Sequence, residues 1–149
     1  MPEFRLPKPD GSRMRWASLE AGVTAPATVF IGPDSDRHLL LAQGRAIKAG
    51  ANVRSFEYPF QDRAGPDWGK LLYNAMIIAS WMLSNGIEEN DLLIVTAPEH
   101  KGFAKQFILA VEGEIRCQRQ FDHSKHSKPD MITECKPGPR PRPIRRLGG

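Results

Sequence analysis

One stretch of this 149-residue sequence indicates the fold class, and it reads ATVFIGPDSD at residues 27–36. Its first five residues are small, β-branched or aromatic, which is typical of a strand buried on both faces. Gly32 and Pro33 end the strand, and the two aspartates Asp34 and Asp36 follow at once. Ligands of parallel sheets bind outside the carboxyl ends of the strands. The stretch therefore predicts a central strand that carries an acidic loop into a binding crevice.

The flanking segments alternate between strand and helix patterns. Apolar residues recur at three- and four-residue spacing in some segments and form short continuous or alternating runs in others. The predicted elements are a short helix at 16–22, strands at 27–31, 52–58 and 91–96, and helices at 39–47, 68–83 and 102–115. This order predicts a three-layer α/β fold, with a mainly parallel sheet and helices on both faces. The carboxyl ends of parallel strands share one edge, so we expect the acidic loop, the 59–66 loop and residues 97–101 to face one crevice.

Composition divides the chain into an irregular arm at 1–15, an α/β domain at 16–116 and a basic tail at 117–149. The net charge is +4, and from Gln118 onward eight Lys and Arg stand against three Asp and Glu. In the tail proline alternates with arginine, which excludes a helix or a central strand. Such a segment favours contact with nucleic acid, by Lys136, Arg140, Arg142, Arg145 and Arg146. A solubilising tail and a proline-rich peptide ligand are the alternatives.

Several functional classes lack sequence support. No apolar run is long enough to span a membrane, no signal peptide is evident, and two cysteines suit a reducing compartment, so we expect a cytoplasmic protein. Neither a P-loop nor a dinucleotide-binding glycine motif occurs. Four residues are of types that can bind zinc, namely Cys117, His123, His126 and Cys135. Their spacings match no common zinc finger, so we interpret them as unpaired thiols and surface histidines.

The acidic loop has two interpretations. Mg²⁺ prefers oxygen ligands and keeps several waters, so Asp34 and Asp36, together with phosphates of a substrate, suffice to hold it. In the alternative, one of the two aspartates only caps the helix that follows.

The surrounding sequence resembles the later half of Toprim domains, a Rossmann-like family that includes primases, type IA and type II topoisomerases and some nucleases. The similarity covers roughly residues 16–73 and lies mainly in the acidic loop and in Asp67-Trp68 before a helix. It implies that Asp34 and Asp36 bind Mg²⁺ and that nucleic acid is the partner. A Toprim enzyme also needs a glutamate after an earlier strand, and no such strand precedes Trp16. Glu99, after the 91–96 strand, is the candidate substitute in permuted order, for metal binding or acid/base chemistry.

Three functions follow from these resemblances. The missing upstream glutamate favours a non-catalytic or accessory Toprim-like module that binds nucleic acid, with a protein partner as a further expectation. The first alternative is a Mg²⁺-dependent enzyme that processes phosphodiesters, of nuclease or primase type. The second starts from residues 32–36, which are similar to the Gly-Ser-Asp-Ser-Asp loop of carboxyaminoimidazole ribonucleotide mutases. There a nucleotide phosphate docks at a helix N-terminus, but Tyr58-Pro59-Phe60 replaces that family's Ser-Ala-His-Arg segment.

Overall fold

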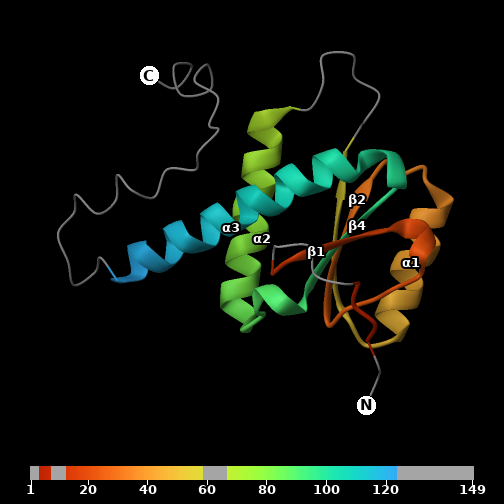
Figure 1. Cartoon of the computed structure of the whole chain (residues 1–149), viewed down its shortest axis with the longest axis horizontal. Helices are drawn as coiled ribbons and strands as arrows, with labels where there is room; N and C mark the ends of the chain where they lie inside the picture. Colours follow the sequence, from red (N-terminus) through yellow and green to blue (C-terminus); the bar gives the residue numbers. More distant parts are fainter. Residues whose placement is uncertain (1–3, 8–12, 59–66, 124–149) are drawn as a thin grey trace. The chain divides into compact units, whose positions relative to one another are not determined.

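A computed structural model of the chain describes residues 4–7, 13–58 and 67–123 (Figure 1). Its elements in chain order are β1 (Arg15–Ser18), the 3₁₀ helix η1 (Leu19–Ala21), β2 (Ala27–Gly32), α1 (Arg37–Lys48), β3 (Asn52–Glu57), α2 (Trp68–Asn85), η2 (Glu89–Asp91), β4 (Leu92–Thr96), η3 (Pro98–His100) and α3 (Lys101–His123). They form two compact units. The first comes from Met1–Gly65 and Ile87–Gln106, and the second from Pro66–Gly86 and Phe107–Gly149.

The first unit is built on a four-stranded sheet in the order β1-β4-β2-β3, in which every neighbouring pair is parallel. The two central strands, β2 and β4, are buried along their whole length. The edge strand β3 is half-buried or exposed, which fits its alternating sequence. The sequence-based prediction of an α/β fold with a parallel sheet is therefore confirmed.

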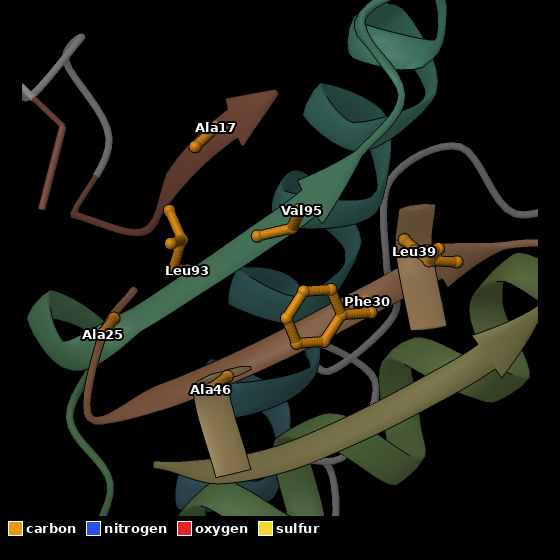
Figure 2. Close-up of a cluster of buried hydrophobic side chains, with 7 residues drawn as sticks. All are labelled: Ala17, Ala25, Phe30, Leu39, Ala46, Leu93 and Val95. Atoms are coloured by element: carbon orange, nitrogen blue, oxygen red, sulfur yellow. The ribbon is translucent and has the colours of Figure 1, made fainter. Parts of the chain in front are cut away.

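One face of the sheet is covered by α1 (Figure 2). Phe30 of β2 lies at the centre of this cluster, between Leu39 and Ala46 of α1. The remaining buried members are Ala17, Ala25, Leu93 and Val95. Full burial of a side chain the size of Phe30 contributes about 1.5–3 kcal/mol, so this cluster fixes α1 on the sheet. Gly32 permits the close approach, since a Cβ there would lie 2.9 Å from Cδ2 of Leu39.

The opposite face of the sheet meets the first turn of α3. Side chains alternate along a strand, so Trp16 points away from the face that Ala17 shares with α1. The Lys101 ammonium lies 5.3 Å from the centre of the Trp16 ring. Phe103 packs against Tyr58, with ring centroids 4.5 Å apart and an interplanar angle of 47°. Helical residues thus contact both faces of the sheet, as the sequence predicted.

The second unit contains α2 and most of α3. Asp67 caps the start of α2 by accepting a hydrogen bond from the Lys70 N–H, 3.1 Å away. The helix ends at Gly86, in the left-handed conformation with φ of 66°. On α3, Gln118 accepts a hydrogen bond from the Ser80 hydroxyl at 3.2 Å and donates one to the Met76 carbonyl at 3.5 Å. The helix α3 continues to His123, beyond residue 117, where the sequence predicted the tail to begin.

The prediction of a helix at 16–22 was wrong in its first half. Arg15–Ser18 forms β1, and only Leu19–Ala21 is helical, ending at Gly22 with φ of 67°. The strand is short and lies at the edge of the sheet, so its own pattern carries little signal. It is held by pairing with β4 and by the Trp16 indole N–H, which donates to Thr96 Oγ1 at 2.9 Å.

Some predictions concern residues outside the described part of the chain. They include the 59–66 loop and the candidate nucleic-acid contacts Lys136, Arg140, Arg142, Arg145 and Arg146. Among the described residues, none of the helices combines the length and the apolar character that a membrane crossing requires.

Candidate functional site

A cavity of about 410 Å³ lies in the first unit, among the segments that follow β1, β2 and β4. Three walls enclose it. They are formed by Leu19, Glu20 and Gly22 of η1 and its cap, by Asp36, His38, Leu41 and Arg45 at α1, and by Ala97, Pro98 and Glu99 after β4. The cavity therefore occupies the position where an open parallel sheet binds its ligand, outside the carboxyl ends of its strands.

The α1 wall begins at its N-cap residue. Asp36 Oδ1 accepts a hydrogen bond from the Leu39 N–H at 3.1 Å, so Asp36 caps the helix. His38, Leu41 and Arg45 follow at spacings of three and four residues, which places them on one side of the helix. From the N-cap to the last turn, this wall thus presents an acid, an imidazole, an apolar side chain and a guanidinium to the cavity.

The two aspartates of the acidic loop differ in position. Asp34 is exposed in a tight turn, which the Asp36 N–H closes by donating to the Pro33 carbonyl at 3.1 Å. Asp36 is half-buried and lines the cavity, whereas Asp34 is not among the lining residues. Sequence analysis predicted that the two aspartates act together, but the structure places only Asp36 in the cavity lining.

The β4 wall carries Glu99 on the η3 turn. Thr96, fully buried at the end of β4, accepts from the Trp16 indole and donates to the Ala97 carbonyl at 2.8 Å. The same carbonyl accepts the His100 N–H at 3.0 Å, which closes the turn. This chain of hydrogen bonds fixes the backbone on which Glu99 stands. Asp36 and Glu99, far apart in the sequence, consequently line the same cavity.

The pKa of His100, the residue that follows Glu99, departs from its ordinary value. Burial lowers the pKa of His100 below its ordinary value, and the neighbouring Glu99 carboxylate partly opposes the shift. His100 therefore stays neutral at neutral pH.

The η1 wall supplies a carboxylate that sequence analysis missed. Glu20 lies on η1, whose start is capped by Ser18 Oγ accepting the Glu20 N–H at 3.1 Å. Finding Glu20 requires knowing that β1 lies beside β4, which the short strand conceals. His38 and Arg45 were missed as well, although they stand seven residues apart, a helical spacing that places both on one side of α1.

The charges of the cavity determine what it can bind. Glu20, Asp36 and Glu99 contribute three carboxylates, against the single permanent positive charge of Arg45. An anion alone would meet a net negative lining, whereas a cation, or an anion that carries a cation with it, would be attracted.

A metal ion enclosed by protein ligands alone does not fit this cavity. Within the described residues, no three His, Cys, Asp or Glu side chains are grouped so that they could hold a metal. Mg²⁺ has weaker requirements, because one or two carboxylates plus substrate phosphates and water satisfy it. Asp36 and Glu99 fit this shared mode of binding.

The other candidate residues lie apart from the cavity lining. Asp67 and Trp68 begin α2 in the second unit. Cys117 is a half-buried cysteine on α3, while His126 and Cys135 fall outside the described residues.

Comparisons with known proteins place no constraint on these interpretations. No protein-family model matches the chain, and no significant match was found among curated proteins or solved structures.

Proposed function

We propose that this chain is a Toprim-like module that associates with nucleic acid and binds a phosphate group in its cavity through a shared Mg²⁺ ion. One observation carries the proposal: Asp36 and Glu99, which follow the adjacent strands β2 and β4, line one cavity. Asp36 is one of the two aspartates of the acidic loop in the Toprim resemblance, Asp34 lies outside the lining, and Glu99 would supply the glutamate from a later strand.

The charge balance of the cavity explains why a divalent ion is needed. Three carboxylates repel a phosphate, and Arg45 offsets only one of them. A Mg²⁺ ion held by Asp36 and Glu99 would reverse the local field and leave coordination positions for phosphate oxygens. Arg45 would then contact the same ligand as a bidentate hydrogen-bond donor.

The basic tail would add affinity of a different kind. Its lysine and arginines would contact phosphates without reading sequence, and this contribution would fall steeply as salt rises. The contribution of the cavity depends on Mg²⁺ as well as on salt. The two contributions are therefore separable by experiment.

A second function is favoured by the position of Glu99. A carboxylate beside a metal-bound phosphate is placed for proton transfer, so the same cavity would suit a Mg²⁺-dependent phosphodiester-processing enzyme. The ion would supply neutralisation of charge on the transferring phosphate. Cleavage or extension of an oligonucleotide that Glu99→Gln abolishes, without loss of binding, would establish this enzymatic function in place of the accessory one.

The test measures oligonucleotide binding by the full chain, in Mg²⁺ and in EDTA, at a salt concentration that weakens the tail. Glu99→Gln should remove most of the Mg²⁺-dependent affinity, about tenfold or more, since a charged ligand interaction is lost. Glu88→Gln is the matched control, because Glu88 is exposed in the same unit and lies outside the cavity lining. Binding that is indifferent to Mg²⁺, or equal losses in both variants, would refute the proposal.

A further inference from the structure

We infer that the cavity holds one unpaired nucleotide of a single strand, and that the site selects single-stranded over duplex nucleic acid. This inference rests on the proposed function and specifies the ligand of the same cavity. It is carried by the order of side chains along α1, by the exposure of Leu41 and by the size of the cavity.

The cavity is polar at both ends of its α1 wall. Asp36 stands at the N-cap, and Arg45 lies nine residues later, in the last turn of the helix, where it also lines the cavity. At about 1.5 Å of rise per residue, the two are separated by roughly 13 Å along the axis. A ligand that satisfies both ends therefore has two separated polar groups, as a nucleotide with its flanking phosphates does.

Between these ends the lining includes two apolar side chains, Leu41 and Leu19, beside His38. Leu41 is 61% exposed although it faces the cavity, so its side chain is not part of the packed core. Leu19, half-buried against the α1-side core, faces the same space. Two leucines between an acidic and a basic end suit the flat face of a base or the carbon atoms of a sugar.

The size of the cavity favours an unpaired nucleotide over one in a duplex. Its volume, about 410 Å³, lies within the range for sites that enclose one small molecule. A base inside a duplex is stacked and paired, so it would have to leave the helix before entering. A base in a single strand enters without that cost. Single strands should therefore bind more tightly than duplexes of the same sequence.

The test compares a single-stranded oligonucleotide with its blunt duplex, using the full chain and counting only the Mg²⁺-dependent affinity. The single strand should bind about tenfold more tightly or better, because the duplex must first release a base. Leu41→Asn should weaken single-strand binding by about fivefold or more through loss of base contact. Leu40→Asn is the matched control, since Leu40 is 52% exposed on the same helix and lies outside the cavity lining.

The contribution of Arg45, at the basic end of the cavity, is tested in the same assay. Arg45→Gln should weaken the single strand about tenfold, because a charge-assisted hydrogen bond to phosphate is lost. Lys48→Gln removes an equal charge from the last turn of α1 outside the cavity and should change affinity little.

Three results would overturn the inference. The first is equal Mg²⁺-dependent affinity of the wild-type chain for duplex and single strand. The second is an equal loss of single-strand affinity in Leu41→Asn and Leu40→Asn, and the third is an equal loss in Arg45→Gln and Lys48→Gln. If Glu99→Gln still removes Mg²⁺-dependent binding in these cases, the proposed function stands. Absence of Mg²⁺-dependent binding to either form would overturn both.

Discussion

Asp36 combines two roles that a pair of substitutions can separate. Its Oδ1 caps α1, and its carboxylate is one of three around the cavity. Asn keeps a side-chain oxygen that can cap but removes the charge, whereas Ala removes both. Asp67 provides an internal control, because it caps α2 with the same 3.1 Å distance and lies outside the cavity lining.

The expected magnitudes follow from these contacts. Asp36→Ala and Asp67→Ala should each lower the free energy of unfolding by about 1 kcal/mol, the usual contribution of an N-cap. Asp67→Asn should cost about 0.5 kcal/mol through loss of the favourable interaction with the helix dipole. Asp36→Asn should cost less, because removing one carboxylate also relieves repulsion from Glu20 and Glu99. Urea denaturation of the four variants measures these differences.

Oligonucleotide binding should also distinguish Asp36 from Asp67. Asp36→Asn should lose Mg²⁺-dependent oligonucleotide binding while remaining close to wild type in stability, and Asp67→Asn should retain it. If Asp36→Asn binds Mg²⁺ and oligonucleotide as the wild type does, Asp36 is only a helix cap and the metal hypothesis fails. If Asp36→Ala is as stable as the wild type, the capping argument fails instead.

Three further predictions concern the surroundings of the cavity. Gly32→Ala should destabilise the fold by about 1–2 kcal/mol, because a new methyl group would displace buried Leu39; a wild-type urea midpoint would contradict this. Thr96→Val should cost about 1–2 kcal/mol, since the Trp16 indole loses its acceptor without loss of volume; the same denaturation measures it, and no change would show that the bond is dispensable. The pKa of His100 is lowered by burial, so the unfolded chain binds more protons between that pKa and about 6.5. The free energy of unfolding should therefore fall as pH drops through 6.5 and level off below the folded pKa. His100→Gln should fall less over this range, and an unchanged pH profile in the variant would contradict the assignment.

The sequence by itself determined the order of the main elements. β2 and β4 were recognisable because a buried parallel strand is a continuous apolar run, and α2 because its apolar residues repeat at helical spacing. The caps were also locally encoded, since Asp36 and Asp67 each accept from a backbone N–H three residues ahead. These features depend on interactions within a few residues, which a sequence displays directly.

Only the tertiary structure decided which of these elements meet. β1 is four residues long at a sheet edge, and its place comes from pairing with β4, a partner distant in the chain. The same pairing order puts β4 beside β2 and so brings Glu99 to the cavity of Asp36, while a turn leaves Asp34 outside its lining. Strand order and side-chain direction in turns arise from long-range packing and backbone geometry, which local patterns do not encode. The sequence therefore placed the acidic loop and Glu99 at one crevice, but the full set of residues that lines the cavity, with Glu20 in it and Asp34 outside it, could not be read from local patterns.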